Sequence, residues 1–289
     1  MYTDILGKKR MKLGLHIHTT ESDGHKTPDE AAKIYKDAGY DAIALTDHWK
    51  VCEPTERSGL RIISGCEYNV GVDTAKGVFH IVALGTEKET GIEKSDSAQT
   101  IIDKIRAAGG LPILAHPAWS LNSVEQVKSL HGFGGTEIFN TVSGMFASNR
   151  PYSGEIVDLM ANAGIIMPLL AVDDTHYYEG DETVGYIMLD VSDGKCDTPS
   201  ILKKIEAVQF YATQGPEIHL EKTKEGIVCR CSPACEISFF SQSSWNGTRM
   251  ARGENLTGAT FVPYDFERWI RCEVTDANGK KAWSNIMVI

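Results

Sequence analysis

The chain is 289 residues long, enough to bury one large core or two, and its apolar and charged fractions of 42% and 24% are ordinary for a globular protein. A formal net charge of -10 argues against stable nucleic-acid binding on a basic surface, and no run of about 18 apolar residues indicates a membrane span. Seven scattered cysteines, and an N-terminal stretch without the apolar core of a secretory signal, lead us to expect a cytoplasmic protein with reduced thiols.

The first predicted element is a short buried strand that ends at His16. His16 and His18 are two residues apart, so on an extended strand both imidazoles point to the same face. Asp23, on the loop that follows, adds an oxygen donor near the same strand end. This combination is typical of a metal site, although a histidine pair alone can also belong to an ordinary buried strand.

A helix is predicted to follow this loop. Thr27 can cap its N-terminus, Pro28 suits its first turn and Glu30 completes a capping box. Apolar residues then recur at helical spacing until Gly39, which ends the helix.

The alternation of strand and helix continues along the chain. We predict strands over residues 41–45, 60–64, 77–85, 111–115, 135–140 and 165–171, and helices over residues 98–108, 124–130 and 154–163. Polar residues recur within these strands or where they end, namely Asp47, His48, Glu67, His80, His116, Asn140, Asp174 and His176. Repeated strand–helix units predict a parallel sheet.

Two architectures would gather these strand ends. In a closed β/α barrel they meet on one face, whereas in an open doubly wound sheet they lie along a crevice. The sequence has no glycine-rich dinucleotide fingerprint after the first strand. Histidines and carboxylates at most strand ends favour a ring, so we predict a barrel.

The pattern changes after residues 210–213. Gly215-Pro216 marks a boundary, and beyond it no helical stripe is evident. Strands are predicted over residues 227–231, 236–240, 269–275 and 282–288, with a turn at residues 276–279. We therefore predict an α/β barrel domain over residues 1–214 and a small all-β, sandwich-like domain over residues 215–289.

Six of the nine histidines fall in the set of predicted metal ligands. The full set is His16, His18, Asp23, His48, Glu67, His80, His116, Asp174 and His176. Imidazole mixed with carboxylate suits Zn, Mn or Fe and is too rich in nitrogen for calcium. Because a catalytic zinc usually takes three protein ligands, this set predicts two or three divalent metal ions, and Glu67 is a good candidate to bridge two of them.

A family resemblance rests on motifs that occur in order between about residues 12 and 180. They are His16-x-His18, Ser22-Asp23-Gly24, Thr46-Asp47-His48, Glu67, His80, Ala115-His116-Pro117 and Asp174-x-His176. Together they resemble the motifs of the PHP (polymerase and histidinol phosphatase) superfamily, which implies a distorted (β/α)7 barrel with a trinuclear metal site. Residues 210–216 and 271–285 resemble PHP metallohydrolases that add a C-terminal β-domain, and some relatives of that type hydrolyse aryl carbamates.

Carried over to this chain, the resemblance divides the ligands among three ions. It implies His16, His18, Glu67 and Asp174 for the first ion, Glu67, His80 and His116 for the second, and Asp23, His48 and His176 for the third. Asp23 stands where some relatives have histidine, so the third site is expected to prefer a harder ion. His80 could instead be buried in the core, and Asp47 is expected to orient His48 rather than bind metal.

These features predict a metal-dependent phosphoesterase that hydrolyses a small phosphorylated substrate through a metal-bridging hydroxide. The predicted catalytic residues are Glu67, Asp174 and His176, and the predicted substrate contacts are Arg150, Asn140 and His25. A guanidinium such as that of Arg150 suits phosphate, and His25 could protonate a leaving group. Two alternatives remain open: hydrolysis of a non-phosphate ester, amide or carbamate at the same metals, and a non-catalytic module that keeps its metals for structure.

Overall fold

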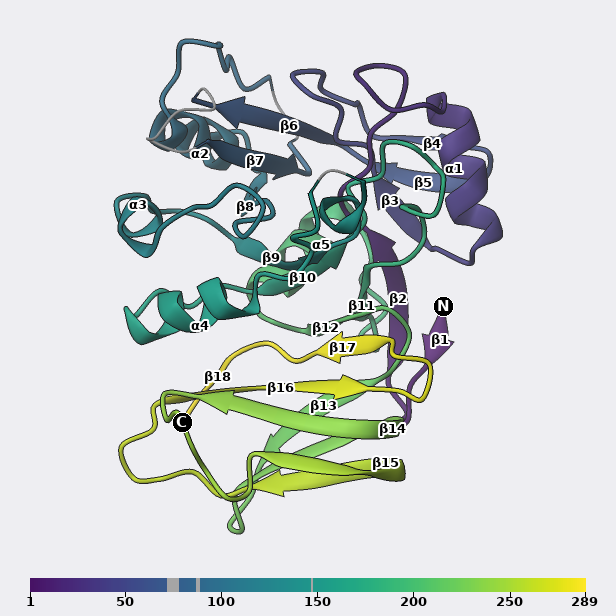
Figure 1. Ribbon diagram of the computed structural model, residues 1–289. Helices are drawn as coiled ribbons and strands as arrows, with labels where there is room; N and C mark the ends of the chain where they lie inside the picture. Colours follow the sequence, from purple (N-terminus) through teal and green to yellow (C-terminus); the bar gives the residue numbers. More distant parts are fainter. Residues whose placement is uncertain (72–77, 87–88, 147) are drawn as a thin grey trace.

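The chain has a mixed α/β fold (Figure 1). The computed structural model describes residues 1–71, 78–86, 89–146 and 148–289. Within these residues the helices are α1 (Pro28–Asp37), α2 (Ala98–Ala107), α3 (Val124–Lys128), α4 (Gly154–Asn162) and α5 (Thr198–Glu206), with a 3-10 turn at Val142–Gly144. No helix of the described residues is long and apolar enough to cross a membrane.

The larger of the two sheets contains strands from both the N-terminal and the C-terminal parts of the chain. Its strand order is β13-β14-β16-β17-β12-β11-β2-β3-β5-β4, and β1, β15 and β18 pair with β2, β14 and β16. Its N-terminal members are β1 (Tyr2–Thr3), β2 (Lys9–Gly14), β3 (Ala42–Ala44), β4 (Thr55–Arg57), β5 (Leu60–Ile63), β11 (Tyr186–Asp190) and β12 (Phe210–Thr213). Its C-terminal members are β13 (Ile218–Lys222), β14 (Ile227–Ser241), β15 (Met250–Phe261), β16 (Trp269–Thr275), β17 (Lys281–Trp283) and β18 (Met287–Val288).

The second sheet has the order β10-β9-β8-β7-β6. Its strands are β6 (Gly65–Val70), β7 (Phe79–Leu84), β8 (Leu111–Leu114), β9 (Gly135–Asn140) and β10 (Leu169–Val172). The second sheet is linked to the larger one at both of its edges, because β5 runs almost directly into β6 and because Ile17, beyond β2, forms a parallel bridge with Thr175, beyond β10. The ends of β2, β3, β8 and β10 are thereby brought toward one region.

The predicted alternation of parallel strands and helices is incomplete. Strands β2, β3 and β5 are parallel, as are β8, β9 and β10, but β6 to β8 are antiparallel and β11 is antiparallel to both β2 and β12. No helix separates β5 from β6 among the described residues. The antiparallel pairing has a functional consequence, since it places residue 67 of β6 diagonally across from residue 80 of β7.

Local sequence signals predicted several elements close to their observed positions. Thr27 caps α1 in a capping box with Glu30, as predicted, and Gly39 lies beyond its end with a φ of 78°. The strand predicted over residues 77–85 is β7, although residue 77 lies outside the described residues. Strands β1, β4, β6, β11, β12, β13 and β15 and helix α5 were not predicted.

The strands predicted at residues 227–231 and 236–240 are one strand, β14. Its pairing with β15 shifts register between Arg230 and Ala234 and again between Ala234 and Glu236. The interruption coincides with Pro233, which has no N–H to donate to a neighbouring strand. The sheet absorbs this residue as an irregularity instead of ending there.

The buried apolar side chains form a large group contributed by both sheets, including Leu13, Ile113 and Ile187. Trp283 of β17 belongs to this group, whereas residues such as Ile237 form a second group within the C-terminal strands. Strands β12 and β17 pair, so the C-terminal strands continue the sheet of the N-terminal part. Figure 1 shows β13 to β18 gathered together, with the N-terminus and β1 beside them.

Candidate metal centre

The structure brings all nine predicted ligands into one cluster. Each has a side-chain donor atom within 3.8 Å of a donor atom of another member. His16 and His18 lie in the extended segment after β2, His48 follows β3, Glu67 and His80 lie on β6 and β7, His116 follows β8, Asp174 and His176 follow β10, and Asp23 lies on the loop after His18. We call these residues the histidine–carboxylate cluster.

Glu67 is buried at the centre of the cluster, and its two oxygens face different histidines. Oε2 lies 3.3 Å, 3.1 Å and 3.2 Å from ring nitrogens of His16, His18 and His48. Oε1 lies 2.8 Å from His80 Nδ1 and 3.5 Å from His116 Nε2. A single carboxylate thus divides five imidazoles into two groups, which is the arrangement needed to bridge two cations.

Asp174 is a second buried carboxylate in the cluster. Its Oδ1 lies 3.1 Å from His16 Nε2 and 3.2 Å from His18 Nε2, and its Oδ2 lies 3.7 Å from His116 Nε2. The backbone of Asp174 has a φ of 56°, a conformation uncommon for a residue with a Cβ, and its N–H donates to the His16 carbonyl. This hydrogen bond ties the segment after β10 to the segment after β2.

A third group of donors lies at the solvent-facing side of the cluster. The Asp23 carboxylate is half-exposed and lies 3.4 Å from His18 Nδ1, 3.8 Å from His48 Nε2 and 3.5 Å from His176 Nε2. Gly24 explains the sharp turn after Asp23, because a Cβ at this position would lie 2.5 Å from the His18 carbonyl oxygen. The loop can therefore pack against the backbone of His18 and return Asp23 toward it.

Glu137 of β9 is a functional residue that the sequence did not reveal. It is buried, its Oε1 accepts a hydrogen bond of 2.7 Å from His16 Nδ1, and its Oε2 accepts from the His116 N–H at 2.8 Å. A carboxylate on Nδ1 leaves Nε2 free to ligate a cation and fixes the orientation of the ring. The available signal was a charged residue within an otherwise buried strand.

We predicted that Asp47 orients His48, but its carboxylate contacts the loop after His18 instead. Its carboxylate accepts hydrogen bonds from the Thr19 N–H at 2.7 Å, the Thr19 hydroxyl at 2.8 Å and the Ser22 hydroxyl at 2.7 Å. Asp47 therefore holds the loop that follows His18, and the Ser22 hydroxyl lies 3.3 Å from His18 Nδ1.

The three predicted substrate contacts occupy different positions. Asn140 is buried, and its amide donates to Glu137 at 2.8 Å and to Asp174 at 3.1 Å, which favours a role in positioning Asp174. His25 is exposed, with its N–H donating to the His176 carbonyl. Arg150 is also exposed.

The close packing of imidazoles and carboxylates shifts their protonation. Burial would lower the pKa of His16, but Asp174, Glu67 and Glu137 together raise it well above its usual range. Burial would raise the pKa of Glu67, but His16, His80 and His116 hold it well below its usual range. A cation bound at His16 would displace the proton that these carboxylates favour on its ring.

The donor set fits divalent cations. Five of the nine members are buried histidines or carboxylates, namely His16, His18, Glu67, His116 and Asp174. Among the described residues, the buried atoms Asp174 Oδ1 and His48 Nδ1 have no hydrogen-bond partner. A buried polar atom without a partner is costly, and a bound cation would remove that cost. Mixed nitrogen and oxygen donors suit Zn, Mn or Fe.

A cavity of about 410 Å³ adjoins the cluster at His48 and gives a substrate room to approach. Its other lining residues are Trp49, Asn69, Gly71 and Lys94. On another side, the half-exposed ring of Trp119 lies edge-on to His80 and His116, with ring centroids 5.5 Å and 4.9 Å apart.

Comparisons with known proteins agree with this geometry. A family model for the PHP domain matches residues 14–108. An uncharacterized protein of Methanocaldococcus jannaschii is 30% identical over 118 residues, which are 37% of this chain and 68% of that protein.

One solved structure shows a similar fold over the whole chain. A two-domain protein of Bacteroides vulgatus, described as containing a predicted PHP-like metal-dependent phosphoesterase, aligns with 100% of this chain and 97% of its own, at 15% identity and a TM-score of 0.56. An amidohydrolase of Chromobacterium violaceum aligns with 58% of this chain and 89% of its own, at 15% identity and a TM-score of 0.44. The first of these likenesses extends the shared fold to the C-terminal strands.

Proposed function

Because the chain belongs to the PHP family, we propose that it is a metal-dependent hydrolase, and specifically a phosphoesterase that acts on a small phosphorylated substrate. The observation that carries this proposal is Glu67, whose two oxygens face separate groups of histidines within 3.5 Å. A structural cation needs only one set of ligands, whereas adjoining sets around a shared carboxylate are suited to hydrolytic chemistry.

We propose that the ligands divide among three cations as the family resemblance implies. The group His16, His18, Glu67 and Asp174 has donor atoms close enough to hold one ion, and so does the group His18, Asp23, His48 and His176. The ligands of the second ion are less clearly separated from those of the third. His80 and His116 both face Glu67 Oε1, but His48, assigned to the third ion, lies near both Glu67 and Asp23. The third site, with its half-exposed carboxylate, is expected to bind its cation most weakly.

When bound, divalent cations would supply Lewis acidity and lower the pKa of a water molecule toward neutrality. Glu67 and Asp174 remain ionised, because neighbouring histidines outweigh burial and hold the pKa of both carboxyls well below the usual range. Their charge would concentrate cations at the centre of the cluster. The exposed His25 would handle protons near the leaving group, whereas His176 would hold a cation at the edge of the cluster.

Arg150 would bind the phosphate from the rim. Its N–H donates to the Ser143 carbonyl, and the Ser143 N–H donates to the Asn140 side chain, which in turn contacts Asp174. This chain of hydrogen bonds connects the backbone of Arg150 to the cluster, and a guanidinium carried there suits a phosphate.

We further propose that residues 1–214 form a distorted seven-stranded barrel and residues 215–289 a separate β-domain. The separate group of buried side chains in the C-terminal strands and the two-domain organisation of the Bacteroides vulgatus protein support this division.

The proposal is tested by hydrolysis assays on purified protein of known metal content. With added manganese, the protein should release phosphate from p-nitrophenyl phosphate and leave aryl esters and carbamates intact. Asp174→Asn and His16→Ala should each lose both bound metal and turnover, and retained metal-dependent turnover in both variants would refute the site assignment.

A panel of phosphorylated metabolites then identifies the substrate. Hydrolysis of esters or carbamates without phosphate release would overturn the phosphoesterase proposal in favour of the other hydrolase chemistry. Full metal occupancy without activity on either panel would indicate a non-catalytic module.

A further inference from the structure

We infer that Asp4, Glu217 and His219 form a second cation site, separate from the histidine–carboxylate cluster. Asp4 lies between β1 and β2, whereas Glu217 and His219 lie at the start of β13. Asp4 precedes β2 and His16 follows it, so the length of the strand puts the two sites about 20 Å apart. The inference does not depend on the proposed hydrolase activity.

The distances among these three side chains suit a shared cation better than hydrogen bonds. His219 Nε2 lies 3.6 Å from Asp4 Oδ2 and 3.8 Å from Glu217 Oε2, and both separations are too long for a hydrogen bond. Tetrahedral zinc with its usual bond lengths would separate its ligand atoms by about 3.4 Å. The histidine–carboxylate cluster has the same spacing, with Asp23 3.5 Å from His176 and 3.8 Å from His48.

His219 supplies a buried donor atom that nothing else uses. Its Nε2 is buried and has no hydrogen-bond partner among the described residues, yet it faces two carboxylates.

The carboxylates keep room for a cation despite their existing hydrogen bonds. Asp4 Oδ2 accepts from Arg10 Nε at 2.7 Å, and Glu217 Oε2 accepts from the Ile5 N–H at 2.8 Å. Each oxygen has a second lone pair available. Asp4 and Glu217 are both buried, and the buried Arg10 guanidinium pairs with Asp4, so a negative charge is left that a cation would neutralise.

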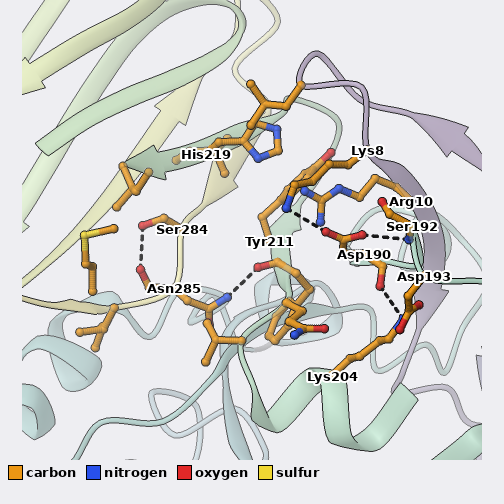
Figure 2. Close-up of a pocket in the computed structure, with 18 residues that line it drawn as sticks. Lys8, Arg10, Asp190, Ser192, Asp193, Lys204, Tyr211, His219, Ser284 and Asn285 are labelled. Atoms are coloured by element: carbon orange, nitrogen blue, oxygen red, sulfur yellow. Dashed lines mark hydrogen bonds and ion pairs between the residues drawn. The ribbon is translucent and has the colours of Figure 1, made fainter. Parts of the chain in front are cut away.

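A cavity of about 670 Å³ adjoins the proposed site at His219 (Figure 2). Its lining includes His219, Arg10 and Lys8, which are labelled in Figure 2. Three protein ligands leave a fourth coordination position, which a water from this cavity can fill. One histidine and two carboxylates suit zinc or a similar divalent cation.

Such a cation would fasten the first residues of the chain to the C-terminal strands. Two hydrogen bonds already connect these parts, from the Tyr2 hydroxyl and from the Ile5 N–H to Glu217. Coordination by Asp4, Glu217 and His219 would join the same segments through metal–ligand bonds, so zinc is expected to hold the N-terminal segment in place.

The test measures zinc equivalents per chain after chelation, reloading with zinc alone and removal of unbound metal. Wild type should bind one equivalent more than His219→Ala or Glu217→Gln, and His131→Ala, which changes an exposed histidine, should match wild type. The same difference should persist in a His16→Ala/Asp174→Asn background, which separates this site from the histidine–carboxylate cluster. Zinc should also slow proteolytic cleavage of the first eight residues in wild type and not in His219→Ala.

Equal zinc content in wild type, His219→Ala and Glu217→Gln would overturn the inference. Circular dichroism establishes that each variant is folded. If His219→Ala does not fold, Glu217→Gln decides the question alone, because glutamine keeps the side-chain shape and an acceptor for Tyr2 or Ile5 while it removes the charge.

Discussion

Glu137→Gln is the sharpest test of how the protein prepares His16 to bind a cation. Glu137 Oε2 accepts two hydrogen bonds of 2.8 Å, from the His116 N–H and from the Asn140 amide, and Oε1 accepts from His16 Nδ1. Glutamine has one oxygen and one NH2 group. Placing its NH2 against the two donors costs about 1–3 kcal/mol for each group left unpaired, so the oxygen should remain there and the NH2 should face His16.

That orientation changes the tautomer of His16. Facing an NH2 group, Nδ1 must accept, and the proton of the neutral ring moves to Nε2. Nε2 is the atom that lies 3.3 Å from Glu67 and 3.1 Å from Asp174, so it can no longer ligate the cation between them. Loss of such a positioning carboxylate should weaken metal binding by about 10- to 100-fold, or roughly 1.4 to 2.7 kcal/mol.

The assay is competition for zinc or manganese against a chromophoric chelator, followed by turnover at increasing metal concentration. Glu137→Gln should need more metal than wild type and should recover part of its turnover when metal is saturating. Glu155→Gln, an exposed position on α4, is the matched control. Unchanged metal affinity in Glu137→Gln would refute the tautomer argument, because the first cation would then not depend on Nε2 of His16.

Three further predictions concern stability. Arg271→Ala leaves Asp158 and Glu273 without their buried guanidinium, so it should lower the free energy of unfolding by about 3–5 kcal/mol in urea titrations, and a loss below 1 kcal/mol would contradict that role. Thr27→Ala removes the cap of α1 and should cost about 1 kcal/mol in the same titrations, whereas no loss would mean that the cap is dispensable. Burial raises the pKa of Asp173 from its usual 3.8 to about 6, so its stabilising contribution is complete below pH 3.8 and is lost as the pH rises through 6. Over that range metal-free wild type should lose about 3 kcal/mol relative to Asp173→Asn, and parallel pH profiles would contradict the shift.

The sequence alone determined those features that depend on neighbouring residues. Helix α1 follows from Thr27 and Glu30, since a cap and its partner are three residues apart and need no tertiary contact. The set of candidate ligands was also readable, because histidines and carboxylates recur where short apolar strands end. The resulting list brought together nine residues that the folded chain places in one cluster.

Tertiary structure alone decided how those residues are held. Glu137 reaches His16 across 121 positions of sequence, and Asp47 holds the loop after His18 because β2 and β3 lie side by side. Likewise, Asp4 meets His219 only when the N-terminal segment packs against β13. Strand order and register set such contacts, and they depend on the balance of packing over the whole core, which no local pattern of residues encodes.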